Sequence, residues 1–272
     1  MNTTAPTIPW TTPQRSAVRT TSEDVRSVRA ALASEWIKLS SLRATKVILT
    51  LTALVGAIVA GGLAATADDP TLTASELFIY PLPLVAMLAS VTGILMFTAE
   101  AQHGTLAVIL SSRPARWVIV TAKTITAATV GLALGITGMV AGFAGASIGG
   151  VELGSGSHLA SRGLWALLYI VLAALVGLGV GMIVRHTAAA ITGLLMWSLV
   201  IESLLAPMLP EGVRHTLPFS AGYRLLDAGP NFEPPVLIAH QLARPQYALV
   251  FAGYALASIV AGTVLLYRRD SN

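Results

Sequence analysis

The chain has 272 residues, of which 54% are hydrophobic and only 11% are charged, and it contains no cysteine. A soluble domain carries about 25% charged residues, so this composition excludes a water-covered surface and predicts that lipid is the main solvent. The lack of cysteine excludes disulfides, thiolate metal sites and catalytic thiols. The formal net charge of +4 would suit nucleic acid, unless the basic residues gather on one side of a membrane.

Residues 1–21 are rich in threonine and proline without a hydrophobic period, so we predict a disordered tail. A helix should follow from Ser22, a suitable N-cap, because apolar residues then recur on one helical face. They are Val25, Val28, Leu32, Trp36 and Leu39. We expect this helix to lie in the membrane interface and to lead into the first span, either as a docking surface or only as an anchor.

Six runs are long and apolar enough for helices that cross about 30 Å of hydrocarbon. They cover about residues 47–65, 77–97, 117–144, 164–184, 188–209 and 247–267. Their polarity does not alternate as in a β-barrel, so the predicted fold class is an all-α membrane protein in which residues 22–272 form a single transmembrane domain. About 46 residues precede the first run, which therefore reads as a retained span and not as a signal peptide.

Lysine and arginine predict the orientation, because cytoplasmic loops carry an excess of both. With the N-terminus inside, only four of the 17 basic residues fall outside, namely Arg162, Arg214, Arg224 and Arg244. Six spans then return the C-terminus to the cytoplasm. The basic surplus is thus a topology signal, and we expect no nucleic-acid partner.

Residues 100–116, EAQHGTLAVILSSRPAR, separate the second and third runs and are too charged to lie in a bilayer. Gly104 and Thr105 can open a short helix with Leu106 on its apolar face, which Pro114 ends. Three basic residues then anchor the chain at the inner interface: Arg113, Arg116 and Lys123. A loop that only reverses direction needs fewer residues, so we expect this segment to present a surface.

Three passages carry a family resemblance: SEWIKLSSLR before the first span, FTAEAQHGTLAVILSSRPARWVIVTAK after the second, and the closing YRRD. They resemble the type-2 ATP-binding-cassette transporter permeases. Their residue pattern is most similar to that of the permeases of bacterial drug-efflux and antibiotic-resistance systems. The resemblance implies a non-enzymatic permease subunit in the bacterial plasma membrane that exports a substrate as a homodimer or with a homologous permease. The sequence has no G-x-x-x-x-G-K-[ST] motif, so ATP and magnesium would be bound by a separate ATPase subunit.

The resemblance also implies where the ATPase subunit docks. In the family an acidic–x–x–x–Gly–Thr passage enters a cytoplasmic coupling helix, and a P-x-R element followed by lysine leads into the third span. The matching positions in and around this passage are Glu100, His103, Gly104, Thr105, Leu106, Arg113, Pro114, Arg116 and Lys123. The interfacial helix before the first span contributes Glu35, Trp36 and Lys38.

Four residues are candidates for the pathway or its outer gate: Tyr80, Met87, Trp197 and Glu202. Glu202 is the one acid placed within a span, where a charge at the bilayer centre costs about 2.5–3.5 kcal/mol. It forms either an outer gate or a polar contact with a neighbouring helix or loop. The other three lie on spans that line the pathway in the resembled family, with ordinary packing as the alternative.

Glycines recur along one ridge of the third span and again in the fourth, which predicts close helix packing in lipid. They are Gly131, Gly135, Gly138, Gly142, Gly177 and Gly181. Residues 210–246 should form short helices that cap the outer side. The histidines there, His215 and His240, are too isolated for a metal site.

Two other functions stay open. One is a membrane sensor or immunity protein on the same scaffold. The other is an intramembrane hydrolase that would use GSGSH at 154–158, although this motif falls in an outer loop and not in a protected cavity.

Overall fold

The computed structural model describes residues 21–41, 43–67, 72–104, 116–154, 159–214, 216–226 and 242–269. Within these residues the regular structure is helical, apart from an isolated bridge between Thr73 and Glu152. Six helices in the described ranges are long and apolar enough to cross a membrane, and each coincides with a predicted run. The chain therefore has the architecture of an all-helical, multi-pass membrane protein.

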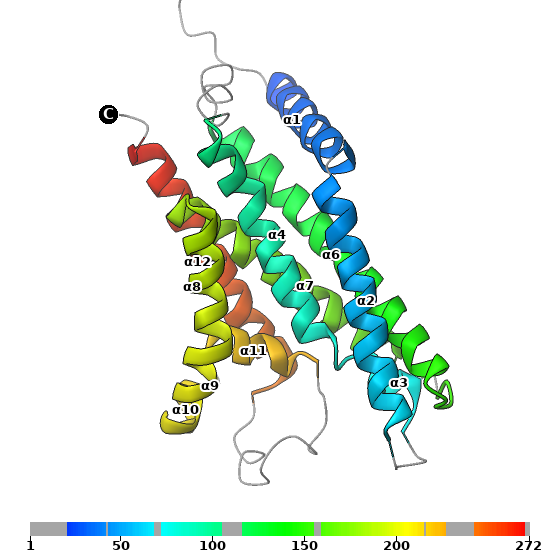
Figure 1. The fold of residues 1–272 in the computed structure, drawn as a ribbon. Helices are drawn as coiled ribbons and strands as arrows, with labels where there is room; N and C mark the ends of the chain where they lie inside the picture. Colours follow the sequence, from blue (N-terminus) through cyan, green and yellow to red (C-terminus); the bar gives the residue numbers. More distant parts are fainter. Residues whose placement is uncertain are drawn as a thin grey trace, which may run out of the picture.

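The helices follow one another in the predicted order (Figure 1). They are α1 (Thr21–Ser41), α2 (Arg43–Ala65), α3 (Ala74–Leu77), α4 (Leu82–Gln102), α6 (Arg116–Ile148), α7 (Leu159–Val184), α8 (Thr187–Leu195), a π-helix (Met196–Ile201), α9 (Glu202–Leu205), a 3₁₀ turn (Ala206–Met208), α10 (Glu211–Arg214), α11 (Pro218–Arg224) and α12 (Arg244–Arg269). Two of the crossings are composite. The second joins α3 to α4 through a turn, and the fifth is α8 continued through the π-helix into α9.

Helix α7 is the centre of the bundle, because it packs against α4, α6 and α12, while α2 packs along α6. Glycine permits the closest of these approaches. Gly177 of α7 lies against the backbone of Ser90 on α4, where a Cβ atom would overlap the Ser90 carbonyl. Ser90 Oγ also donates a hydrogen bond of 2.9 Å to the carbonyl of Ala173 on α7. The glycine ridges thus serve close helix packing, as predicted.

Helix α1 is the predicted N-terminal helix, and its apolar face is divided between two surroundings. Val28 and Leu32 pack against a small cluster that includes Val118 and Ala122 of α6. Trp36, in contrast, is 60% exposed. The helix therefore packs against the protein along part of its apolar face, and the protein leaves the Trp36 side chain largely uncovered.

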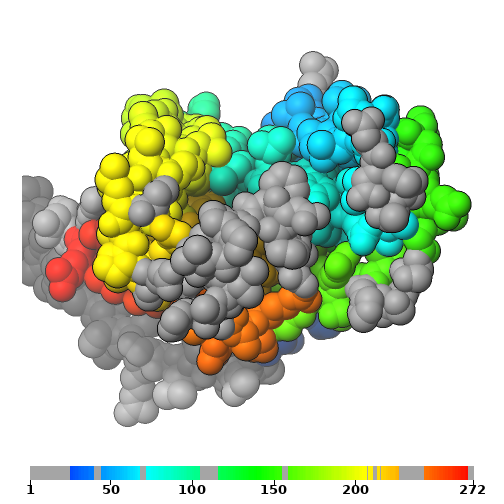
Figure 2. All heavy atoms as spheres, turned by 90° about the horizontal axis from the view of Figure 1, so that it is seen from below, coloured from blue at the N-terminus to red at the C-terminus, as the bar shows by residue number. Residues whose placement is uncertain are grey.

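The bundle has two ends with different contents. One end, called here the terminal end, carries α1, the last turn of α4, the first turns of α6 and the last turn of α12 (Figure 1). The opposite end carries α3, α10 and α11. Seen from that end, the yellow α8–α10 segment lies to one side, and the cyan α3 and green α6 lie to the other (Figure 2). Short helices α10 and α11 lie in the segment 210–246, where short helices are predicted, whereas residues 227–241 lie outside the described ranges.

Candidate functional site

Four charged side chains from three helices meet at the terminal end. Lys38 of α1 contacts Glu35 on its own helix at 3.2 Å and Glu100 of α4 at 2.8 Å. Lys123 of α6 lies 2.8 Å from the other oxygen of Glu100 and 3.4 Å from Glu35. Two acids and two lysines thus form a charge-neutral cluster, called here the ionic cluster, that joins α1, α4 and α6.

The ionic cluster is shielded unevenly from solvent. Lys123 is only 1% exposed, whereas the Lys38 side chain keeps 40% of its surface. Lys123 Nζ also donates a 3.0 Å hydrogen bond to the carbonyl of Met96, one turn before Glu100. A buried ammonium without carboxylates would be strongly unfavourable, so Lys123 requires its acids to remain in place. The sequence predicts Lys123 as an anchor at the membrane interface; the structure instead places it inside the protein.

The acids of the cluster also affect Lys38, which lies outside the membrane-spanning helices. Burial of Lys38 favours its neutral form, but hydrogen bonding and charge attraction from Glu100 and Glu35 outweigh this effect. The pKa of Lys38 therefore lies above its ordinary value. Lys38 is held as a cation between the two acids, which keeps the cluster neutral.

Arg116, at the first position of α6, makes a separate connection to the last helix. Its guanidinium donates to the carbonyls of Tyr267, at 2.9 Å, and Leu266, at 3.3 Å. The same group lies 5.4 Å from the centre of the Tyr267 ring. A cation at a helix C-terminus is favourable because the last carbonyls lack intrahelical donors. Arg116 thus fixes the start of α6 to the end of α12.

The remaining predicted coupling residues lie at the end of α4 or beyond it. His103 is exposed, and its Nδ1 lies 2.6 Å from the carbonyl of Ala99. Gly104 has a φ of +71°, a conformation in which glycine is favoured at the end of a helix. Thr105, Leu106, Arg113 and Pro114 lie outside the described residues. The predicted coupling helix is accordingly framed by two described helices, α4 and α6.

At the opposite end, Glu202 is 4% exposed and its carboxylate is surrounded by neutral donors. One oxygen accepts from the indole N–H of Trp197 at 2.9 Å and from the backbone N–H of Phe219 at 3.1 Å. The other accepts from the N–H and the hydroxyl of Ser220, at 2.7 and 2.8 Å. The acid therefore binds the first turn of α11, where helix N–H groups lack intrahelical acceptors.

A cavity of about 350 Å³ adjoins this carboxylate, and its wall includes Met87, Tyr169, Ser198 and Arg214. Ser198 Oγ lies 3.2 Å from the sulfur of Met87, which connects the π-helix to α4. A π-helical turn is rare and is frequent at functional sites. Of the four pathway candidates, Met87 and Glu202 line this cavity and Trp197 bonds to Glu202. Tyr80 does not line the cavity and packs instead against the apolar core.

The sequence reasoning found the members of the ionic cluster but not their association. Glu35 and Lys38 are predicted on one docking element, and Glu100 and Lys123 on another; the structure brings all four together. It missed Tyr169, Arg214 and Ser220 at the cavity altogether, since none stands out in sequence. Lys123 lies seven residues into a predicted apolar run. Its position could have indicated a pairing with an acid, because a charge at that depth needs a counter-charge.

The six crossings and the buried polar groups define the chain as a helical integral membrane protein, with a polar site near each end of the bundle among the described residues. No protein-family model matches the chain, and a search of curated proteins finds no match to it.

Proposed function

We propose that this chain is the membrane-spanning permease subunit of an ATP-binding-cassette exporter in a bacterial plasma membrane. In this proposal both termini are cytoplasmic, and two permeases, identical or homologous, form the pathway. A separate ATPase subunit, which binds ATP and magnesium, supplies the energy, and this chain catalyses no reaction itself. The segment 105–115, together with α1, is the surface on which that subunit docks.

The observation that carries the proposal is the connectivity around this segment. Glu100, at the end of α4, is paired with Lys38 of α1 and with Lys123 of α6. Arg116, on the far side of the segment, is bonded to the end of α12. A displacement of residues 105–115 would therefore act on four helices together. Such linked helices are what a partner needs in order to bias two packings of a bundle.

The opposite end supports an outer gate in the same scheme. The Glu202 carboxylate holds α11 against the fifth crossing, and a cavity lies next to it. A rearrangement of the helices at the terminal end would have to break or move these bonds to open the cavity outward. Glu202 is thus a gating residue in this proposal and Met87 lines the pathway.

The proposal is tested by expressing the chain with the ATPase encoded by a neighbouring reading frame and reconstituting both in vesicles. We expect the two to co-purify and the ATPase rate to depend on the permease. Glu100→Gln should lower this stimulation several-fold, because Lys38 and Lys123 lose their ion pairs with α4. A matched control is Glu76→Gln, an acid at the opposite end of the same crossing that bonds Thr73.

Topology gives an independent test, because the chain has no cysteine of its own. Thr105→Cys should react with a membrane-impermeant maleimide only after the cell membrane is permeabilised. Labelling of intact cells at this position would contradict the proposal. So would transport by the purified chain without any ATPase.

A further inference from the structure

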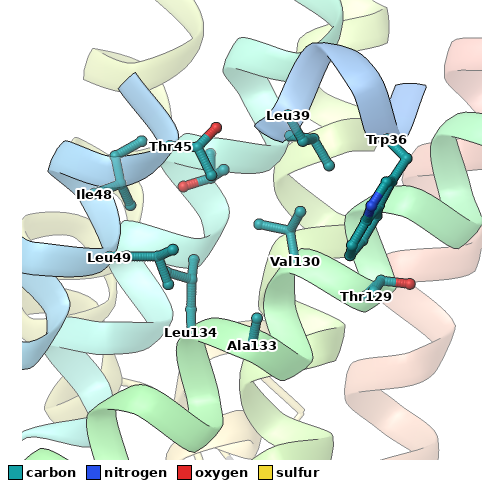
Figure 3. Close-up of a pocket in the computed structure, with 10 residues that line it drawn as sticks. Trp36, Leu39, Thr45, Ile48, Leu49, Thr129, Val130, Ala133 and Leu134 are labelled. Carbon is teal, nitrogen blue, oxygen red and sulfur yellow. The ribbon is translucent and has the colours of Figure 1, made fainter. Parts of the chain in front are cut away.

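A second pocket, distinct from the Glu202 cavity, lies under the junction of α1 and α2. It has a volume of about 200 Å³ and is bounded by α1, α2, α4 and α6. Figure 3 shows Trp36 and Leu39 reaching down from α1 toward α6, with Ile48 and Leu49 of α2 on the other side. Trp36 and Ala133 are exposed, so the pocket lies at the lateral surface of the bundle.

The wall offers almost no polar group to an occupant. Thr92 Oγ donates to the Leu88 carbonyl at 2.7 Å, and Thr129 Oγ donates to the Ile125 carbonyl at 2.9 Å. Both hydroxyl protons are thus used by their own helices. A water molecule is stable in a cavity only with two to four polar partners, so this pocket favours an apolar occupant.

The surroundings indicate which apolar occupant would fit the pocket. Ile48 and Leu49 come four and five residues after the start of the first crossing at Ala44, or about 6–8 Å along the helix axis. The 22 residues of this crossing rise about 33 Å, close to the thickness of the hydrocarbon, so both residues lie at the level of the lipid acyl chains. Thr129 and Ala133 of the pocket wall lie on a face of α6 that also carries a row of exposed apolar side chains: Ile125, Leu132, Ile136 and Val140. The pocket therefore opens beside a surface that lipid must cover.

The residues at the margin of the pocket nearest the terminal end suit the polar end of a lipid. Trp36 belongs to the residue types that gather at the level of the headgroups. Lys46, next to Thr45 of the pocket wall, is exposed and carries a charge that complements a phosphate. A volume below the usual 300–1,000 Å³ of small-molecule sites suits one chain segment more than a drug-sized molecule. We infer that this pocket binds one acyl chain of a membrane phospholipid, with the headgroup beside Trp36 and Lys46.

Binding of an acyl chain in this pocket would stabilise the ionic cluster through α1. The α1 turn that covers the pocket with Trp36 and Leu39 also carries Glu35 and Lys38 into the cluster. An acyl chain that fills the pocket would fix this turn against α6. The lipid would thus act on the position of α1, and its binding needs no ATPase partner.

The test uses the full chain in vesicles of phosphatidylethanolamine and phosphatidylglycerol that contain a phosphatidylethanolamine with a diazirine in its acyl chain. After irradiation, adducts are mapped by mass spectrometry. We expect adducts at Leu49, Val130 and Ala133 to be several-fold more frequent than at Leu249 and Leu256 of α12, although these two are 73% and 65% exposed. An even distribution over the exposed apolar residues would overturn the inference.

Two substitutions sharpen the result. Ala133→Trp fills the pocket and should reduce adducts at Leu49 and Val130 several-fold, whereas Ala257→Trp, at an exposed position on α12, should leave them unchanged. Equal adduct yields in both variants would overturn the inference. Ala133→Cys in this cysteine-free chain tests a second copy as the occupant. Efficient cross-linking between two copies at this position would assign the pocket to a dimer interface instead, and its absence agrees with a lipid.

Discussion

The two ends of the bundle bury carboxylates in different ways. At the terminal end, Glu100 is neutralised by two lysines that come from two other helices. At the opposite end, Glu202 is stabilised by neutral donors, namely an indole, a hydroxyl and two backbone N–H groups. Both arrangements satisfy an acid in an apolar surrounding. They differ in what they hold together and in what happens when one partner is removed.

The ionic cluster depends on long side chains that can change partners. Lys38 contacts both Glu35 and Glu100, and Lys123 contacts the same two acids, so α1, α4 and α6 could shift while every charge keeps a counter-charge. The Glu202 arrangement has no such freedom, because backbone N–H groups are fixed on α11. We conclude that the terminal end is suited to movement with retained pairing, and the opposite end to a bond that is either made or broken.

The largest effect is expected at Lys123, the most deeply buried charge of the ionic cluster. Lys123→Ala leaves Glu100 with Lys38 as its single counter-charge in the cluster and should lower the free energy of unfolding by about 3–5 kcal/mol. Unfolding of the purified protein in mixed micelles measures this loss. Lys46→Ala, at an exposed position on α2, serves as control and should change stability by less than about 0.5 kcal/mol.

A double substitution separates lost charge from lost packing. In Lys123→Met with Glu100→Gln, both members of the shortest inter-helix pair to Lys123 become neutral and Glu35 keeps Lys38. The double variant should be more stable than Lys123→Met alone, since no uncompensated buried charge remains. If the double variant is instead the less stable of the two, the pairing described here is not what makes Lys123 important.

A smaller effect is expected at Glu202. Glu202→Ala removes the acceptor of two backbone N–H groups at the start of α11 and should cost about 2–3 kcal/mol. The indole of Trp197 loses its acceptor as well, so its fluorescence should change in a variant where Trp197 is the one remaining tryptophan. Ser203→Ala, a neighbouring exposed residue, is the control. Wild-type stability of Glu202→Ala would show that the carboxylate does not hold α11.

The sequence was sufficient to predict the crossings, because length and hydropathy are properties of each segment by itself. The ionic cluster was not predictable in the same way, since Lys123 and Glu35 are 88 positions apart and meet only through the packing of α1 on α6. Three of the donors to Glu202, on Phe219 and Ser220, follow it by 17 and 18 positions, and two of them are backbone N–H groups, which leave no mark in the sequence. The π-helix was missed because its residues are as apolar as those of an ordinary helix.

Substitution of Arg116 should lower stability less than substitution of Glu202, because Arg116 bonds at the end of a helix. Arg116→Ala leaves the carbonyls of Leu266 and Tyr267 without its guanidinium and should cost about 1 kcal/mol. Hydrogen exchange should rise in the last turn of α12 and remain unchanged near Tyr169. Arg116→Lys should recover only part of the loss, since an ammonium cannot donate in the planar geometry of a guanidinium. Equal exchange in wild type and Arg116→Ala would contradict the link.

The smallest effect concerns the pH dependence that Lys38 contributes. Its pKa is higher in the folded protein than in the unfolded chain, because Glu100 and Glu35 favour the cation more strongly than burial disfavours it. This stabilisation is fully present below the unfolded pKa, about 10.4, and is lost as the pH rises through the higher folded pKa. The Tm difference between wild type and Lys38→Met should therefore be constant from about pH 7 to 9.5 and shrink above about pH 10.5. Lys46→Met provides the background, since any alkaline loss common to both variants is not due to Lys38. A Tm difference that grows above that pH would mean that the acids do not stabilise the Lys38 cation.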